Sequence, residues 1–139
     1  VYRIMSVAVG VGTRFPALAT SMGRAILACG SPERAEAFLS DAAPTSLTPH
    51  TLTDPAALRA EFTRIRAQGW ALNDQELEEG LRSIAAPLRD ASGEVVAALN
   101  ISTTVRRSLD EIREQLSGPL LDTARAIQED IDRVGLRVP

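Results

Sequence analysis

The chain of 139 residues has few of the side chains that most often carry out catalysis, with one cysteine and one histidine. Cys29 has no second cysteine with which to form an internal disulfide, which fits a reducing compartment, and we expect a cytoplasmic protein. His50 lies in a segment rich in Thr and Pro, and no serine stands in a Gly-x-Ser-x-Gly motif. The sequence therefore predicts that the chain is not an enzyme, and a small hydrolase that depends on His50 is the weakest alternative.

Long apolar runs and an excess of positive charge are also missing. No apolar run approaches the roughly 18 residues of a membrane-spanning helix, and no signal peptide is visible, so we expect no membrane contact. The formal net charge is -3, and Arg106-Arg107 is the only adjacent basic pair. Because nucleic-acid-binding proteins concentrate Lys and Arg on one face, we do not expect this chain to bind DNA by itself. It begins with Val1 rather than an initiator Met, and we expect a fragment of a longer protein.

The length is enough for one domain with a hydrophobic core, since apolar residues make up 45% of the chain. Turn residues, helix caps and apolar spacing predict the elements of the first half. These are a strand over 2–9, an extended piece over 13–17, a helix from Thr20 or Ser21 to about Ala28, a second helix from Pro32, and a third from Pro55 to Gly69.

The second half predicts a sheet followed by a terminal helix. Strand candidates cover 70–72, 81–89 and 94–103, with an acidic loop at 73–80 and a hairpin turn at 90–93. Because residues 95–99 are apolar throughout, we expect their strand to be central and buried on both faces. A capping box at 108–111 begins a C-terminal helix, which Gly118-Pro119 either kinks or divides. The fold class is α+β with a mainly antiparallel sheet.

Small polar residues occupy positions in the predicted sheet where apolar ones would be expected. Asn73, Ser83, Asn100 and Ser102 all lie in or beside segments that otherwise resemble a core. Buried polar groups cost free energy unless they find partners, so their convergence would suit a small polar ligand, while mutual hydrogen bonding is the alternative. Asn100 and Ser102 are two positions apart and face the same side of their strand.

The predicted helix that begins near Ser21 offers a site for an anion. The first backbone N–H groups of a helix, here those of Ser21, Met22 and Gly23, lack internal partners and attract a carboxylate. Ordinary capping is the alternative. Arg14 is a second candidate anion partner, with a surface salt bridge as its alternative.

The acidic run 74–79 lacks the pattern of a calcium-binding loop, so we interpret it as a solvated loop. We therefore expect neither a metal nor a cofactor.

Four stretches together resemble the C-terminal effector-binding domain of IclR-family transcriptional regulators. They are GTRFPALATSMGRAILA (12–28), DPAALRAEFTRIRAQGW (54–70), NDQELEEGLRSIAAPLRD (73–90) and VVAALNIS (95–102). The resemblance spans nearly the whole chain and is closest to regulators of β-ketoadipate pathway genes, which answer protocatechuate, 4-hydroxybenzoate or related acids.

The resemblance implies a GAF-like fold, with a curved antiparallel sheet flanked by helices, for residues 1–139 as one effector-binding domain. It implies a winged helix-turn-helix domain N-terminal to this chain, through which alone DNA would be bound, and a homo-oligomer, either a dimer or a tetramer. It also implies a pocket for a small carboxylic acid. Its lining would be Ile4, Val7, Phe15, Ser21, Met22, Asn73, Leu81, Ser83, Asn100 and Ser102.

The leading hypothesis is therefore a ligand-sensing domain of a transcription regulator, in which an aromatic carboxylic acid changes the assembly or spacing of attached DNA-binding domains. The alternative is a GAF-like oligomerisation module without a physiological ligand, whose C-terminal helices would be the working surface.

Overall fold

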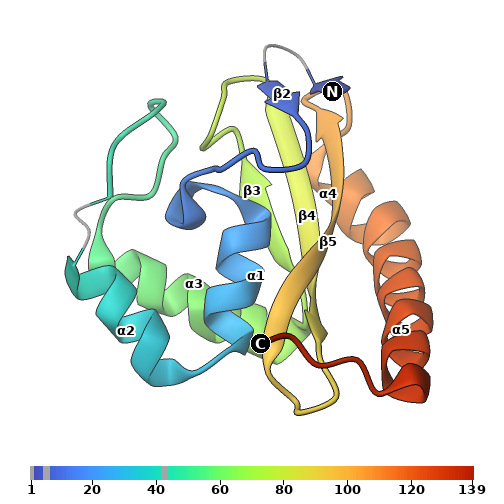
Figure 1. Cartoon of the computed structure of the whole chain (residues 1–139). Helices are drawn as coiled ribbons and strands as arrows, with labels where there is room; N and C mark the ends of the chain where they lie inside the picture. The colour runs from blue at the N-terminus through green and yellow to red at the C-terminus, as the bar shows by residue number, and fades with distance from the viewer. Residues whose placement is uncertain (1, 5–6, 42–43) are drawn as a thin grey trace.

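A three-stranded antiparallel sheet forms the centre of the molecule, with helix α1 on one face and helix α5 on the other (Figure 1). The computed structural model describes residues 2–4, 7–41 and 44–139, and of residues 2–4 and 7 it describes the backbone alone. The sheet consists of β3 (Ala71–Asp74), β4 (Leu81–Arg89) and β5 (Val95–Thr104), in the order β3-β4-β5. This arrangement confirms the predicted α+β class with an antiparallel sheet.

Three helices precede the sheet, and capping residues set their bounds as predicted. They are α1 (Ser21–Cys29), α2 (Pro32–Asp41) and α3 (Pro55–Gln68). The Thr20 hydroxyl accepts a hydrogen bond from the Gly23 N–H of α1 at 3.2 Å, and Asp54 Oδ2 accepts one from the Ala57 N–H of α3 at 3.1 Å. Gly69 ends α3 in the left-handed conformation, with φ of 86°, which glycine adopts at no steric cost.

The N-terminal segment folds differently from its prediction. Instead of one strand over 2–9, it forms β1 (Tyr2–Ile4) and β2 (Val7–Val9), which pair antiparallel with Tyr2 opposite Val9. No Gly, Pro or Asn interrupts the apolar run, so its pattern does not distinguish one strand from two short ones. The extended piece predicted over 13–17 has no strand, and the 3-10 helix η1 (Ala17–Ala19) takes its last part.

The prediction that 95–99 forms the central strand is wrong, because β4 lies between β3 and β5 among the described strands. Strand β5 nevertheless has helices over both of its faces. Ala98 packs on the core beside α1, and Leu99 packs on the core beside α5. An edge strand covered on both sides carries the same continuous apolar run as a central strand.

Two hydrophobic cores result, one on each face of the sheet. On the α1 face, Leu58, Phe62 and Ile65 of α3 are buried together with small residues of α1 and the sheet, and on the α5 face Ile84 of β4 packs against Ile112 and Leu120. The α1 face is the one that bears the predicted polar residues, since Ser83 alternates with Ile84 along the strand.

The C-terminal helical stretch is continuous from Leu109 to Val134, composed of α4 (Leu109–Glu111), the π-helical turn η2 (Ile112–Leu116) and α5 (Ser117–Val134). The Ser108 half of the predicted capping box is present, since Ser108 Oγ accepts from the Glu111 N–H at 3.1 Å. Pro119 has no N–H to donate to the preceding turn, and the wider π turn lies just before it. Gly118-Pro119 therefore does not divide the helix. In the described part of the chain, no helix has the length and hydropathy needed to cross a membrane.

Candidate functional site

A cavity of about 350 Å³ lies between the start of α1 and the sheet. Helix α1 packs on β4 and β5 along its length, but its first turn stands over the polar end of the sheet, where small side chains leave space. The described residues that line the cavity are Val9, Phe15, Thr20, Ser21, Met22, Asn73, Leu77, Leu81, Ser83, Asn100 and Ser102.

The floor of the cavity is a polar row that crosses all three strands. Strand register places Asn73 opposite Ser83, and Ser83 opposite Ser102. Asn100 joins them because alternate residues of β5 share a face. Three separate segments thus bring their polar side chains to one side of the sheet, as the sequence predicted for Asn100 and Ser102.

Four of these side chains form a chain of hydrogen bonds. Ser21 Oγ lies 2.8 Å from Ser83 Oγ and donates to Asn100 Oδ1 at 2.9 Å, and Asn100 Nδ2 donates to Ser102 Oγ at 2.8 Å. Since the Ser21 hydroxyl has one proton and donates it to Asn100, the Ser83 hydroxyl must be the donor in its hydrogen bond with Ser21. The Ser102 hydroxyl then keeps its own proton for a further acceptor, and one N–H of Asn100 also remains.

The direction of this chain can reverse. Asn100 contacts hydroxyl groups at both ends of its amide, and a hydroxyl donates or accepts equally well. A rotated Asn100 amide would donate to Ser21, which would then donate to Ser83 and leave the Ser83 proton free instead. The network can therefore present a hydroxyl donor at either end, which suits ligands with differently placed acceptors.

Asn73 is held by the backbone rather than by this network. Its Nδ2 donates to the Ala19 carbonyl, and its Oδ1 accepts from the Glu76 N–H at 3.0 Å. The side chain is 3% exposed. Asn73 therefore joins the segment before α1 to the turn after β3, and forms a wall of the cavity with one of its two N–H donors and one acceptor position already used.

The start of α1 has one of its N–H groups already satisfied. The cap from Thr20 occupies the Gly23 N–H, so this group is not available to a carboxylate as the sequence suggested. Gly23 serves close packing instead, because a Cβ there would lie 2.2 Å from the Ala17 carbonyl oxygen. Helix geometry leaves the N–H groups of Ser21 and Met22 without an intrahelical acceptor, and both residues line the cavity.

A buried ion pair next to the cavity was not foreseen. Arg24 and Glu76 are 0% and 6% exposed, and the guanidinium donates to both carboxylate oxygens at 2.6 and 2.5 Å. The interpretation of 74–79 as a solvated loop is therefore wrong for Glu76. The sequence signal was weak, because one acidic residue in an acidic run has no periodicity that would mark it as buried.

Asp74 is also paired, since its Oδ1 accepts from Arg82 Nε at 2.8 Å. Burial acts to raise the pKa of Asp74, but hydrogen bonds from Arg82 and Gln75 and the charges of Arg82 and His50 outweigh it, and the pKa falls below its usual value. The acidic run thus consists partly of structural ion pairs. Among the described residues, no group of His, Cys, Asp and Glu side chains could hold a metal ion.

Most of the predicted site residues meet at this cavity. Phe15, Ser21, Met22, Asn73, Leu81, Ser83, Asn100 and Ser102 all line it. Arg14 is exposed and does not line it, and neither does Gly23. The side chains of Ile4 and Val7 lie outside the described part of the structure.

Three lining residues were missed by sequence reasoning. Thr20 was seen as a helix cap, Val9 as part of a strand, and Leu77 as part of the acidic run, yet all three face the cavity. The sequence gives no clear signal for Leu77, because a single leucine among polar residues is also common on protein surfaces.

The residues suited to nucleophilic chemistry do not gather here. His50 is exposed and lies 3.9 Å from Glu79 at its Nε2, and Cys29 is at the far end of α1. Burial raises the pKa of the Cys29 thiol against the opposing charges of Arg89 and Arg66, which keeps it protonated at neutral pH.

Known proteins are similar to this chain in sequence. The family model described as Bacterial transcriptional regulator IclR C-terminal matches residues 2–129. The Pca regulon regulatory protein of Pseudomonas putida is 49% identical over 121 residues, which are 87% of this chain and 42% of that protein. The regulator BhcR of Paracoccus denitrificans is 36% identical over 116 residues, 84% of this chain and 42% of its own. The chain thus spans about two fifths of the length of these curated relatives.

Solved structures agree with this assignment. A transcriptional regulator from Rhodococcus sp. RHA1 superimposes with a TM-score of 0.88 at 45% identity, covering 96% of this chain and 54% of that one. The inducer-binding domain of PobR from Acinetobacter, a double mutant in complex with 3-hydroxybenzoic acid, gives a TM-score of 0.78 at 29% identity, covering 86% and 69%. The resemblance and the GAF-like α+β fold are thereby confirmed, within a family of regulators rather than enzymes. This chain belongs to the IclR family of bacterial transcriptional regulators, as a C-terminal effector-binding domain.

Proposed function

We propose that the cavity between α1 and the sheet binds a small aromatic hydroxy acid, of the class of protocatechuate or 4-hydroxybenzoate. The observation that carries this proposal is the hydrogen-bond chain from Ser83 to Ser102, which ends in a free hydroxyl donor inside a cavity that also has apolar walls. An aromatic ring would contact the apolar walls of this cavity, while polar substituents at its two ends would reach the start of α1 and the polar row.

The carboxylate of the acid would meet the N–H groups of Ser21 and Met22, where the helix carries positive partial charge. The ring would lie among Phe15, Met22 and Leu81, and a ring hydroxyl would bond Ser102 or Ser83. A cavity of about 350 Å³ has room for a single substituted ring. Two relatives support an aromatic acid as the ligand. The solved PobR domain is a complex with 3-hydroxybenzoic acid, and the relative from Pseudomonas putida is the regulatory protein of the Pca regulon.

For the longer protein, we infer a DNA-binding regulator that acts as a homo-oligomer. The winged helix-turn-helix would lie outside this chain, since relatives that this chain matches over only 42% and 48% of their length are named HTH-type regulators. Effector binding would act only through a different affinity for two arrangements of the subunits.

The test is isothermal calorimetry on the chain with protocatechuate, 4-hydroxybenzoate and 3-hydroxybenzoate, and with succinate as a non-aromatic acid. Ser102→Ala and Asn100→Ala should weaken the best aromatic acid by roughly 2- to 10-fold, because each variant disrupts one neutral hydrogen bond to the ring hydroxyl or its support. Ser40→Ala, an exposed serine of α2, is the matched control and should change nothing. Equal affinity for wild type and both cavity variants would contradict the proposal, and a chain that binds none of the acids would favour the oligomerisation module.

A further inference from the structure

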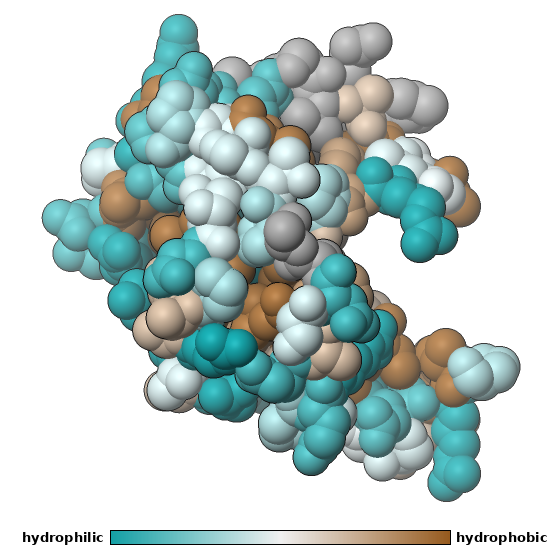
Figure 2. Space-filling model, turned by 90° about the vertical axis from the view of Figure 1, so that its left-hand side faces the viewer, coloured by the Kyte–Doolittle hydropathy of each residue, from teal (hydrophilic) through white to brown (hydrophobic). Residues whose placement is uncertain are grey.

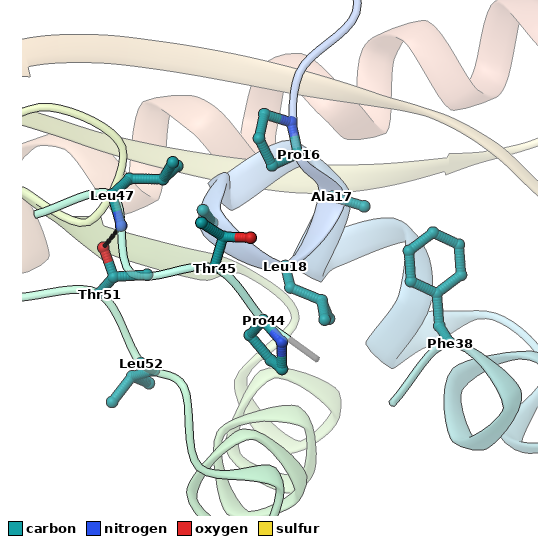
Figure 3. A pocket seen from close by; sticks show the side chains of 10 residues that line it. Pro16, Ala17, Leu18, Phe38, Pro44, Thr45, Leu47, Thr51 and Leu52 are labelled. Atoms are coloured by element: carbon teal, nitrogen blue, oxygen red, sulfur yellow. Dashed lines mark hydrogen bonds between the residues drawn. The ribbon is translucent and has the colours of Figure 1, made fainter. Parts of the chain in front are cut away.

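A second cavity, of about 270 Å³, lies beside the first. The same stretch of chain supplies a wall to each: Phe15, Thr20 and Ser21 face the first cavity, and Pro16–Ala19 face the second. Figure 3 shows the second cavity, which helix α2 and the loop before α3 close on its other sides. Its lining is Pro16, Ala17, Leu18, Ala19, Phe38, Pro44, Thr45, Leu47, Thr51 and Leu52.

The chemistry of this lining selects an uncharged ligand. None of the described lining residues is charged, and the only side-chain hydroxyls belong to Thr45 and Thr51. Thr51 Oγ1 already donates to the Glu76 carbonyl at 2.7 Å and accepts from the Leu47 N–H at 3.2 Å. The Thr45 hydroxyl points toward Ala17 (Figure 3) and has no hydrogen bond within the described chain, so it can serve a ligand. A charged group would lose its hydration here without gaining a partner.

Two large apolar side chains stand half exposed at the rim. Phe38 is 38% and Leu47 43% exposed, and they flank the cavity on opposite sides in Figure 3. Figure 2 looks onto this side of the molecule, where hydrophobic side chains lie at the bottom of a hollow surrounded by more polar residues. An occupant would remove this apolar surface from water.

Size narrows the occupant further. An apolar cavity of about 150 Å³ is enough to hold benzene, so one of about 270 Å³ accommodates a single ring with a short substituent. Leu18 closes the floor and is 7% exposed. The space is thus that of a small molecule.

We propose that this cavity is a second ligand site, for a neutral one-ring aromatic molecule, and that it is coupled to the effector cavity through η1. The Leu18 carbonyl accepts from Arg24 Nε at 2.8 Å, and the Ala19 carbonyl accepts from Asn73 Nδ2. A ligand packed on η1 therefore acts on groups that also fix the start of α1 and the polar row. If a ligand at one site changes the affinity at the other site, the second ligand changes the affinity for the first by the same factor. The coupling, but not the site itself, rests on the proposed function.

The site is tested by two-dimensional ¹H–¹⁵N NMR titration of the chain with toluene, phenol and benzylamine. Toluene and phenol should shift the amides of Ala17–Ala19, Phe38 and Leu47, and the cation benzylamine should not. Thr45→Trp fills the cavity and should remove these shifts, while Ser46→Trp, an exposed neighbour that does not line it, should preserve them. Thr45→Val should weaken phenol by roughly 2- to 10-fold, the loss of one neutral hydrogen bond, and leave toluene unchanged.

Shifts that persist in Thr45→Trp, or that are absent from the wild type, would overturn the site. The coupling is measured by repeating the calorimetry of the best aromatic acid with and without saturating toluene, in wild type and in Thr45→Trp. An affinity that changes in the wild type alone supports the coupling, and an affinity that changes in neither refutes it. If no acid binds, the proposed function fails, while the toluene titration still decides the site.

Discussion

Arg24 and Glu76 lie 52 positions apart in the chain and form an ion pair that is closed off from solvent. The pair joins three segments: Arg24 Nε also donates to the Leu18 carbonyl at 2.8 Å, and Glu76 Oε1 also accepts from the Leu52 N–H at 2.9 Å. The start of α1, the turn after β3 and the loop before α3 are thereby tied at one point. Both cavities are built on these same segments.

Removing one partner of this pair should be costly. Arg24→Met leaves the Glu76 carboxylate buried without compensation and should lower the free energy of unfolding by about 3–5 kcal/mol in urea denaturation. The double variant Arg24→Met/Glu76→Leu should lose less than the sum of the two single variants, because no charge remains buried. Arg59→Met breaks an exposed pair with Glu36 and is the control, with little change expected. Equal effects of Arg24→Met and Arg59→Met would show that burial of the pair does not matter.

Two glycines of α-helices offer a comparison of a crowded position with an open one. A methyl group at Gly23 would meet the Ala17 carbonyl at 2.2 Å, so Gly23→Ala must displace η1 and should destabilise by about 1–3 kcal/mol or more. Gly118, in the first turn of α5, has nothing beyond its chain neighbours within 4 Å of such a methyl, and the gain in helix propensity is opposed by the contact of the methyl with the Pro119 ring, so Gly118→Ala should change the stability by less than about 1 kcal/mol. Thermal unfolding of both variants measures the difference. A stable Gly23→Ala with unchanged ligand binding would contradict the close packing of η1 on α1.

The helices could be predicted from the sequence because local signals define them. Thr20, Asp54 and Ser108 are capping residues, and Gly69 ends α3, so the bounds follow from residues close to one another in the chain. The order of the strands could not be predicted in this way. Strand β5 is apolar because helices cover both of its faces, and its pattern does not reveal that β4 lies between it and β3.

The candidate site was predictable to the extent that its residues interrupt regular patterns. Ser83, Asn100 and Ser102 are polar where apolar residues are expected, and register brings them together. Arg24 and Glu76 gave no such signal, because each looks like an ordinary charged residue of a helix or a loop. Only the tertiary structure shows that these two residues, 52 positions apart in the chain, form one buried ion pair.

The C-terminal tail should detach at low pH. The pKa of Asp90 is held below its usual 3.8, first by a hydrogen bond from the Ser92 side chain and then by the Val138 N–H. A lowered folded-state pKa means that the unfolded chain binds a proton first, so Asp90 stabilises the fold above about pH 3.8 and this contribution is lost as the pH falls through the folded-state value. In Asp90→Asn, the free energy of unfolding should therefore fall less steeply than in the wild type as the pH is lowered from about 5 to about 3. The amide hydrogen of Val138 should exchange with solvent faster in the variant at pH 7. An unaltered exchange rate would show that the hydrogen bond from Val138 to Asp90 does not hold the C-terminal tail.

A negative charge introduced at position 100 should prevent the effector cavity from binding an anion. Asn100→Asp keeps the shape of the side chain but places a carboxylate in the hydrogen-bond chain, where it accepts from Ser21 and Ser102. Two negative charges about 4–5 Å apart repel by about 3–4 kcal/mol at an effective dielectric constant of about 20, which corresponds to a loss of a hundredfold or more in affinity.

A neutral analogue separates this repulsion from a damaged cavity. 4-Hydroxybenzamide has the ring and hydroxyl of 4-hydroxybenzoate without its charge, so in calorimetry Asn100→Asp should weaken it by at most roughly 2- to 10-fold, the loss of the one neutral hydrogen bond from Ser102. The acid should bind the wild type alone, and its loss in the variant should grow as the ionic strength falls, because screening weakens the repulsion. An acid that binds Asn100→Asp as tightly as wild type would mean that the anion sits away from the polar row, and the position of the carboxylate at Ser21 and Met22 would have to be abandoned.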